Sequence, residues 1–291
     1  MNISELINHA IEYILLHIGE NVTAAKVAEH CHVSRFYFTR IFKQQTGESV
    51  YAFIKKKKLE FSAFMLKSES TRSITDIAGE YGYSPSNYSS AFKDYFDRSP
   101  VEFRRERFGH HNELLNPENK SVRMIYDEIN STVSIRQMPQ YSIVYERRIG
   151  NYSEMKNCWS DFCKRYDRFH TDQTLYFERT FDDPSITDKN KCLYDICMSD
   201  EGINAAAEKC GGITKLKLPD SAAFGTISGG KFAVCPFKGY LSEINQFHRK
   251  LMGIWLPLCG YSLDSRYSYD LYHKVEENTY YMEFDVCIPI K

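Results

Sequence analysis

The sequence repeats itself at an offset of 50 residues, and this repeat constrains the fold more than any other feature. Residues 34–43 (SRFYFTRIFK) and 84–93 (SPSNYSSAFK) begin with the same serine and end with the same Phe-Lys pair. Outside these segments, Ala28 recurs as Ala78. Chance rarely produces so many matches at one offset without a gap, so residues 20–105 are predicted to form a duplicated helical unit.

Each copy is predicted to contain two helices joined by a short turn. In the first copy, Phe38, Ile41 and Phe42 fall on one face of a helix that Ser34 is predicted to cap. Helix, three-residue turn and helix form the helix-turn-helix motif, whose second helix enters the major groove of DNA. The residues left on or near the other face are the predicted DNA contacts: Arg35, Phe36, Thr39, Arg40 and Lys43. Arginine matches guanine best, so Arg35 and Arg40 are the predicted base readers.

A longer helix is predicted between the copies, from Ser49 to Lys67, with Phe53, Leu59, Ala63 and Leu66 facing inward. At 1.5 Å per residue it would be roughly 27 Å long, a rigid spacer between two reading helices. A single chain could then read an asymmetric DNA site as a monomer, because major-groove windows on one side of a duplex lie about 34 Å apart. The polar side of this helix is predicted to carry Lys55, Lys56, Lys57 and Lys58. With Arg104, Arg105 and Arg107, these lysines could neutralise phosphates or form a solvated basic face.

Length and composition favour two domains in a reducing compartment. A chain of 291 residues suits two domains of ordinary size, and the formal net charge of −1 shows no global basic bias. The nine cysteines are scattered and form no CxxC pair, which fits the cytoplasm. Residues 1–19 are predicted to form an amphipathic helix and not a secretory or membrane segment. His30, Cys31 and His32 are too closely spaced to hold one ion, so no metal site and no cofactor is predicted.

Residues 106–121 are rich in Gly, Asn, Pro and charge, and a second duplication follows them. GNYSEM at 150–155 resembles GYLSEI at 239–244, and LYDICM at 193–198 resembles EFDVCI at 283–288. Each copy is interpreted as strand, helix and strands, with Trp159 on the first helix and Trp255 at the end of the second. Two such halves predict an α+β domain with a cleft along their pseudo-twofold junction.

The first part of the chain resembles the DNA-binding region of AraC/XylS-family transcription regulators. The matching segments are SRFYFTRIFKQQTG, IKKKKLEFSAFML, SITDIAGEYGYSPSNYSSAFKDYF and SPVEFRR. By this resemblance the base readers of the first unit fall on Arg35, Phe36, Thr39 and Arg40, and those of the second on Pro85, Ser86, Asn87 and Ser90; Lys93 repeats Lys43. The sequence departs from the family pattern at three positions. Asp97 stands where the family usually has a glycine after the second recognition helix, and Gly79 stands where the family's usual alanine after Ala78 is out of register. Ser90 stands where an arginine is common. The second helix-turn-helix is therefore expected to hold phosphates more than it reads bases.

The second part resembles the GyrI-like effector-binding domain through SIVYERRIGNYSEM, GGKFAVCPFKGYLSEI, WLPLCGY and FDVCIPI. Such domains hold aromatic, often cationic compounds between aromatic walls against a buried acid. The family glutamate falls on Asp270, a shorter acid. The implied effector-binding residues are Asp270, Tyr269, Tyr272, Trp255 and Trp159, and the alternative is that these aromatics are ordinary core. Glu146 and Glu178 are weaker candidates for the same site, and a solvated strand position is the favoured interpretation of each.

These observations are interpreted as a multidomain transcription regulator and not an enzyme. We expect an all-α double helix-turn-helix domain at 1–107, a linker at 108–121 and, at 122–291, an α+β effector domain of two pseudo-symmetric strand-helix-strand-strand repeats. The expected partners are double-stranded DNA, a small aromatic or cationic effector and RNA polymerase, with no membrane, and the family pattern implies an activator. Two alternatives stay open: a protein-interaction or covering module without a ligand, and a GyrI-like hydrolase fused to a DNA-binding domain.

Overall fold

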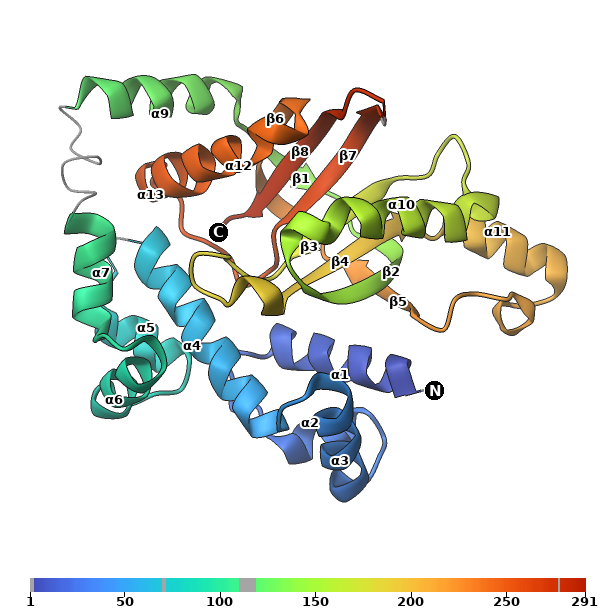
Figure 1. Ribbon diagram of the computed structural model, residues 1–291, viewed down its shortest axis with the longest axis horizontal. Helices are drawn as coiled ribbons and strands as arrows, with labels where there is room; N and C mark the ends of the chain where they lie inside the picture. Colours follow the sequence, from blue (N-terminus) through green and yellow to red (C-terminus); the bar gives the residue numbers. More distant parts are fainter. Residues whose placement is uncertain (1–2, 70–71, 110–118, 277) are drawn as a thin grey trace. The chain divides into compact units, whose positions relative to one another are not determined.

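The computed structural model describes residues 3–69, 72–109, 119–276 and 278–291, without the side chains of 107–109 (Figure 1). Packing divides the chain into two compact units. The first unit contains residues 1–128 and 250–260, and the second contains 129–249 and 261–291.

Helices build the first unit in the order that the duplication predicts. They are α1 (Ile3–Leu16), α2 (Ala24–His30), α3 (Arg35–Thr46), α4 (Val50–Ser68), α5 (Ile74–Glu80), α6 (Pro85–Phe96), α7 (Pro100–Gly109) and α9 (Lys120–Thr132), which continues into the second unit. The pair α2–α3 is one helix-turn-helix, and α5–α6 is the other. In Figure 1, α4 runs between the two pairs.

The two copies start their second helices differently. The hydroxyl of Ser34 accepts a hydrogen bond from the backbone N–H of Tyr37 at 3.3 Å, as predicted for a capping serine. Ser84 occupies the same N-cap position before α6 but makes no side-chain capping bond. Pro85 takes the first helical position, where its fixed φ favours the helix without such a bond.

Left-handed backbone recurs at matching positions of the two copies. Gly47 ends α3 with a φ of 78°, and Asp97 ends α6 with a φ of 57°. In the turns between the paired helices, His32 has a φ of 56° and Gly82 a φ of 76°. Each copy therefore has glycine at one left-handed position and a larger residue at the other. The backbone path is the same in both copies although the residues differ.

The second unit is built on one antiparallel sheet of eight strands, in the order β1-β6-β8-β7-β3-β4-β2-β5. The strands are β1 (Ser134–Met138), β2 (Tyr141–Gly150), β3 (Tyr176–Thr180), β4 (Cys192–Ser199), β5 (Ala222–Ile227), β6 (Gly230–Tyr240), β7 (Tyr269–Glu276) and β8 (Tyr281–Pro289). Helix α10 (Met155–Tyr166) follows β2, and α12 (Leu241–Lys250) follows β6. The units β2-α10-β3-β4 and β6-α12-β7-β8 confirm the predicted strand-helix-strand-strand repeats.

Strand order shows how the repeats are joined. The order β2-β4-β3 in one half is mirrored by β6-β8-β7 in the other, and β3 pairs with β7 at the junction. A pseudo-twofold axis therefore passes between β3 and β7. The extra strands β5 and β1 extend the two outer edges.

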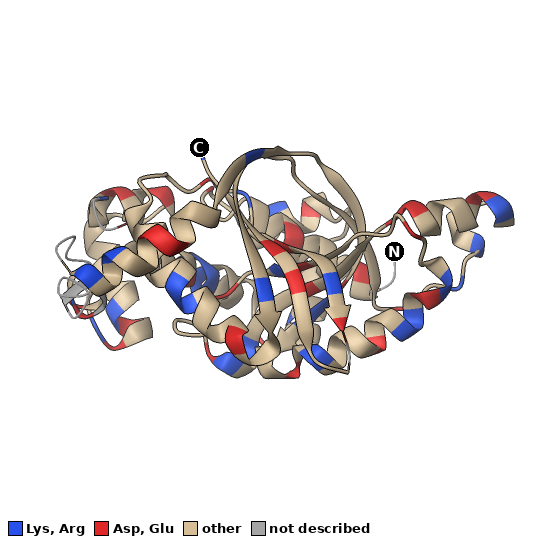
Figure 2. Cartoon of the chain, turned by 90° about the horizontal axis from the view of Figure 1, so that it is seen from above, with Lys and Arg blue, Asp and Glu red and all other residues tan. Residues whose placement is uncertain are grey.

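The sheet has a core on each face. One cluster takes a buried residue from every strand, including Met138 of edge strand β1 and Ile227 of edge strand β5. A single cluster can include both edges only if the sheet is strongly curved, as Figure 2 shows. On the other face, Phe162 and Tyr166 of α10 and Ile203 of α11 (Glu201–Cys210) cover the first half of the sheet.

Several expectations concern the segment between the halves. Of the expected linker at 108–121, residues 110–118 lie outside the described residues, and α9 begins at Lys120. The domain boundaries at 107 and 122 stay predictions. Among the described residues, no helix is long and apolar enough to cross a bilayer.

Candidate functional site

The face of α3 that was predicted to contact DNA is exposed. Arg35, Arg40 and Lys43 are open to solvent, and Phe36 is 81% exposed, an unusual value for a phenylalanine. Thr39 is half-buried and donates its hydroxyl to the carbonyl of Phe36 at 3.2 Å. The opposite face packs into the core through the buried side chains of Phe38, Ile41 and Phe42.

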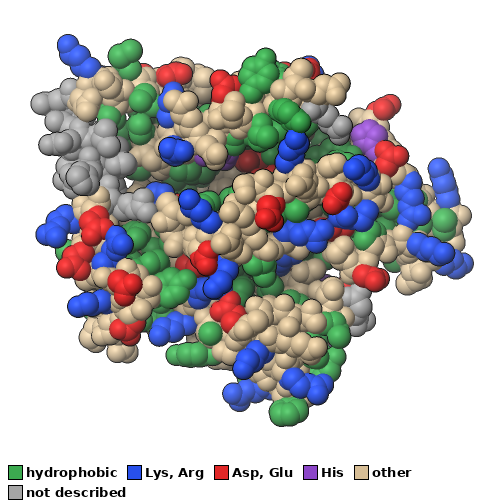
Figure 3. All heavy atoms as spheres, in the orientation of Figure 1, with side chains coloured by type: hydrophobic (Ala, Val, Ile, Leu, Met, Phe, Trp, Pro, Cys, Tyr) green, Lys and Arg blue, Asp and Glu red, His purple; other side chains and the backbone are tan. Residues whose placement is uncertain are grey.

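Helix α6 presents the equivalent face with less charge. Its exposed predicted contacts are Pro85, Ser86, Asn87, Ser90 and Lys93. Tyr88, Ala91 and Phe92 are buried at the positions that match Phe38, Ile41 and Phe42. Figure 3 shows Lys and Arg side chains gathered at the lower tip of the first unit, over α3. Of the two predicted recognition faces, the one on α3 therefore carries more positive charge.

The lysine run of α4 is largely structural. Lys57 is only 1% exposed, and its Nζ lies 3.2 Å from Oε2 of the buried Glu60, so the prediction that all four lysines share the polar side is wrong for Lys57. Lys56 forms an ion pair with Glu48. Lys58 donates to two backbone carbonyls. Helix α4 buries more of its circumference than a helix with one apolar stripe, because other helices pack on several sides of it.

Arg104 also differs from a solvated phosphate ligand. Its side chain is half-buried, and burial lowers the pKa of its guanidinium. Within the described residues, its Nε and Nη2 make no hydrogen bond. Arg105 is exposed, and the side chain of Arg107 lies outside the described residues.

The candidate effector site of the second unit centres on two acids at the pseudo-twofold junction. Glu178 on β3 and Asp270 on β7 are direct partners in the strand register. Asp195 and Asp285 are the aspartates of the two repeated motifs, on β4 and β8. The strand partner of Glu178 is the residue that follows Asp195, and the strand partner of Asp270 is the residue that follows Asp285. The two acids therefore occupy equivalent positions in the two repeats and also face each other across the axis.

Each acid is approached by a ring nitrogen from the helix of its own repeat. Trp159 on α10 donates its indole N–H to Oε2 of Glu178 at 2.9 Å. His248 on α12 places Nε2 3.9 Å from Oδ2 of Asp270. Gly150 and Gly239 are matching glycines of the two repeats. Trp159 lies nine residues after Gly150, and His248 lies nine residues after Gly239. The site thus has an acid and a ring nitrogen in each half.

Tyr272 adds an asymmetric contact, because its hydroxyl donates to Oε2 of Glu178 at 3.2 Å. The rings of Trp159 and Tyr272 meet edge to face with centroids 5.3 Å apart. The ring of Tyr176 also meets the indole edge to face, with centroids 6.2 Å apart. The Glu178 carboxylate is therefore held among aromatic rings and two donors.

Burial governs the electrostatics of this site. It raises the pKa of Glu178 to about 7, although the hydrogen bonds from Trp159 and Tyr272 act in the opposite direction. Burial and then the charge of Glu178 raise the pKa of Asp270 well above its ordinary value. Partial burial lowers the pKa of His248, whose side chain is still 32% exposed. Burial and mutual repulsion therefore favour a proton on the acid pair near neutral pH.

The structure brings together three of the five residues predicted for effector binding: Asp270, Tyr272 and Trp159. Tyr269 precedes Asp270 on β7 and points to the opposite face, where it packs in the core cluster with Phe177 and Leu271. Trp255 is buried in the segment 250–260, which packs with the first unit. The site proposed below therefore omits Tyr269 and Trp255.

Two acids were misjudged from the sequence. Glu146 and Glu178 are 0% and 6% exposed, so their interpretation as solvated strand residues is wrong. Glu146 is held by Arg165 of α10 at 2.6 Å and by Arg148, which makes it a structural ion pair. Glu178 instead accepts hydrogen bonds from two neutral donors, Trp159 and Tyr272. Glu178 lies 17 residues before Asp195 and Asp270 lies 15 residues before Asp285, so aligning the repeats through LYDICM and EFDVCI brings the two acids only to within two positions of each other.

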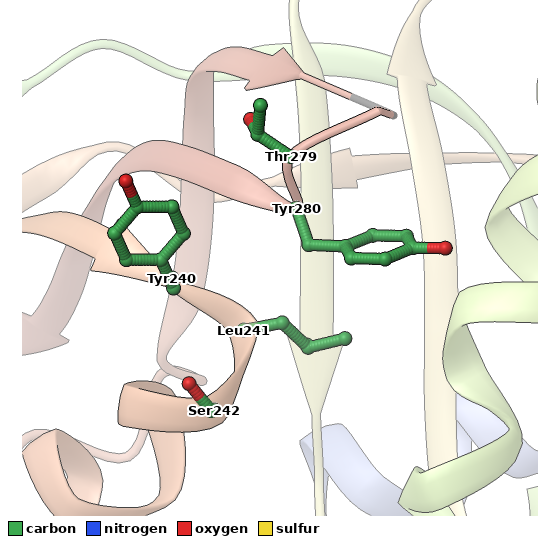
Figure 4. Close-up of a pocket in the computed structure, with 5 residues that line it drawn as sticks. All are labelled: Tyr240, Leu241, Ser242, Thr279 and Tyr280. Carbon is green, nitrogen blue, oxygen red and sulfur yellow. The ribbon is translucent and has the colours of Figure 1, made fainter.

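A pocket of about 400 Å³ opens in the same unit at the start of α12 and the turn between β7 and β8. Its lining is Tyr240, Leu241, Ser242, Thr279 and Tyr280 (Figure 4). The side chains of Leu241 and Tyr280 extend in the same direction in Figure 4. Lys156 of α10 places its Nζ 3.7 Å from the ring centroid of Tyr280, a cation–π contact between the two repeats. None of these residues was predicted as a site.

Among the described residues, no group of three or more His, Cys, Asp or Glu side chains is arranged to hold a metal ion. Asp195, the aspartate of the first repeated motif, instead binds the guanidinium groups of Arg147 and Arg179 at 2.8 and 2.6 Å. This buried cluster lies on the face opposite Glu178.

Comparisons with known proteins match the two parts of the chain to two domain families. Residues 27–106 match a helix-turn-helix domain family, and residues 131–291 match the GyrI-like small molecule binding domain. The chain is 31% identical to Regulatory protein SoxS of Salmonella typhimurium, over 36% of this chain and 97% of SoxS. It is 31% identical to the Msm operon regulatory protein of Streptococcus mutans over 34% of this chain, and it spans only 36% of that relative.

Among solved structures, the chain is similar to the C-terminal domain of AraT, a response regulator from Geobacillus stearothermophilus. The identity is 33%, over 37% of this chain and 89% of that chain, with a TM-score of 0.34. The fold and the family matches together define a DNA-binding transcription regulator that carries a small-molecule-binding domain. The chain belongs to the AraC family of regulators, with a C-terminal GyrI-like domain.

Proposed function

We propose that this protein is a one-component transcription activator in the cytoplasm, which reads an asymmetric DNA site as a monomer and binds a cationic, aromatic effector. DNA is contacted by the exposed faces of α3 and α6, and RNA polymerase is its partner at the promoter. The effector changes the affinity for DNA because it binds one arrangement of the protein more tightly than another. The GyrI-like domain acts as a sensor and catalyses no reaction.

The observation that carries the effector proposal is the buried carboxyl of Glu178, which faces Asp270 across the strand pair. Two acids at one buried site repel each other, and a cation between them relieves that repulsion. The rings of Trp159 and Tyr272 add attraction of about 0.5–2 kcal/mol each for a cation over their faces. A cation that carries aromatic rings satisfies both features at once.

Calorimetric titration with tetraphenylphosphonium tests this site. We expect micromolar binding to the full chain, and a loss of at least tenfold in Glu178→Gln and in Asp270→Asn, since each removes one negative charge. Asp172→Asn is the matched control, because Asp172 is an exposed acid of the same unit. Equal affinity in all four proteins would remove the acid pair from the effector site.

Selection of DNA from a random library tests the DNA proposal. The wild-type chain should enrich sites with two sequence windows. Arg40→Ala should weaken binding to the enriched site by about 1–3 kcal/mol and relax the preference at one base pair. Unchanged base preference would show that Arg40 does not read DNA.

A further inference from the structure

The two helix-turn-helix units meet at one lysine. Lys58 lies in the middle of α4 and donates from Nζ to the carbonyl of Glu20 at 2.9 Å and to the carbonyl of Tyr81 at 3.0 Å. Glu20 precedes α2, the first helix of the α2–α3 pair. Tyr81 is the C-cap of α5, the first helix of the α5–α6 pair. One ammonium group therefore joins both helix-turn-helix pairs through the helix that separates them.

The surrounding backbone is closely packed at this point. A Cβ added to Gly19 would lie 3.3 Å from the carbonyl oxygen of Glu80, and one added to Gly82 would lie 3.4 Å from Nζ of Lys58. The approach to α2 and the turn before α6 are thus in contact around the lysine. Burial lowers the pKa of Lys58, in keeping with an ammonium that has exchanged water for carbonyl oxygens.

This junction is well placed to control the geometry of DNA reading. Tyr81 lies four residues before Pro85, the first residue of α6. A rotation at the junction would move α6 relative to α3. One base pair changes the separation of two major-groove windows by about 3.4 Å and rotates them by about 35°. Two rigidly held helices therefore fit only one spacing.

We propose that Lys58 is a positioning residue that sets the number of base pairs between the two DNA windows read by α3 and α6. The proposal rests on the proposed two-window reading of DNA. Lys58 touches no base in this role. It acts through the carbonyls of Glu20 and Tyr81, which it holds together.

The test is selection from a random DNA library with the full chain, followed by affinity measurements on sites with one base pair inserted or deleted between the windows. Wild type should enrich one spacing. Lys58→Met keeps the apolar stem but removes the donor, so it should enrich several spacings while keeping both window sequences. Its affinity for the wild-type site should fall about tenfold, whereas sites changed by one base pair should bind within threefold of that value.

Three further variants separate positioning from general damage. Lys58→Arg keeps a charged donor and should retain the single spacing. Lys56→Met is the matched control on the same helix, because the ion-pair partner of Lys56 is Glu48, which lies outside the α5–α6 pair. Gly19→Ala presses on Glu80 without altering the lysine, so it should also broaden the spacing, which keeps the proposal testable should Lys58→Met fail to fold.

The outcomes are distinct. If wild type enriches no sequence, the proposed DNA function fails. If wild type enriches two windows at one spacing and Lys58→Met selects that same spacing alone, the positioning role is overturned. Enrichment of a single window by wild type also overturns it, because no spacing then exists for Lys58 to set.

Discussion

Glu178 and Asp270 are direct register partners across β3 and β7 and equivalent residues of the two repeats. A near-twofold axis therefore brings two acids of similar environment face to face. Burial and mutual repulsion make their double ionisation costly. A cation that enters the site should displace a proton from this pair, and the effector affinity should depend on pH.

The first prediction follows from this exchange. With the pKa of Glu178 raised to about 7, tetraphenylphosphonium should bind about tenfold more tightly at pH 8 than at pH 6, since one proton leaves as the ligand binds. Calorimetry in buffers of different ionisation enthalpy would count that proton. The other titrating groups coupled to the acids are His248, Tyr272 and Cys287.

Glu178→Gln provides the control for the proton count. The variant keeps a hydrogen-bond acceptor for Trp159 and Tyr272 but cannot ionise. Its residual binding should lose most of the pH dependence between pH 6 and 8. Wild-type binding that does not change with pH would contradict proton exchange even if the cation binds.

The second prediction concerns stability. The folded-state pKa of Glu178, about 7, lies above the ordinary value near 4.3, so the folded state binds more protons than the unfolded state between these pH values. The free energy of unfolding should therefore fall as pH rises from about 4.5 to about 7. Glu178→Gln should be more stable than wild type at pH 8, by on the order of 1–3 kcal/mol, and the difference should shrink towards pH 5.

Urea unfolding followed by tryptophan fluorescence at pH 5, 6, 7 and 8 measures this difference, because Trp159 bonds to Glu178. Glu208→Gln, at an exposed acid of α11, should leave the pH profile as in wild type. A Glu178→Gln variant that is less stable than wild type at pH 8 would show that the ionised carboxylate stabilises the fold.

The sequence predicted the duplications, the helix faces and the strand-helix-strand-strand order because these depend on local periodicity. It did not predict the surroundings of Glu178, whose burial arises from pairing between strands that lie about 90 residues apart. His248 was not predicted because each repeat contains one tryptophan, and the prediction paired Trp159 with Trp255. Lys57 was misplaced because a run of lysines is typical of a solvated face, and only packing on several sides of α4 buries one of them.

The third prediction is a gain of specificity on α6. Ser90 is exposed at the position that matches Arg40. Ser90→Arg should give the second unit a base reader and add about 1–3 kcal/mol of preference for guanine at one position. Selection from a random library, compared with wild type, would reveal a new preferred base pair in the second window. A uniform increase in affinity for all sequences would instead indicate a phosphate contact.

The fourth prediction concerns the left-handed residue at the end of α6. Asp97 has a φ of 57° where the first copy has Gly47. Glycine relieves the steric cost of this conformation but gains freedom in the unfolded chain, so Asp97→Gly should stabilise the first unit by about 0.5 kcal/mol. Gly47→Asp should destabilise it by a similar amount. Thermal unfolding followed by circular dichroism at 222 nm would show a change of the wrong sign directly.

The fifth prediction tests the buried pair of α4. Nζ of Lys57 and Oε2 of Glu60 are 3.2 Å apart, and their side chains are 1% and 4% exposed. Lys57→Met should destabilise the protein by about 3–5 kcal/mol, because it leaves the charge of Glu60 buried without its cation. The double variant Lys57→Met/Glu60→Gln should recover most of that loss, since the amide is neutral and still accepts the 2.9 Å hydrogen bond from Tyr95.

Lys55→Met is the matched control, because Lys55 lies on the same helix and is half-exposed, so its loss should cost less than about 0.5 kcal/mol. Urea unfolding of wild type, Lys57→Met, Glu60→Gln and the double variant measures the coupling between Lys57 and Glu60 as a double-mutant cycle. If the double variant is as unstable as Lys57→Met alone, the destabilisation comes from lost packing of the lysine stem and not from an uncompensated charge.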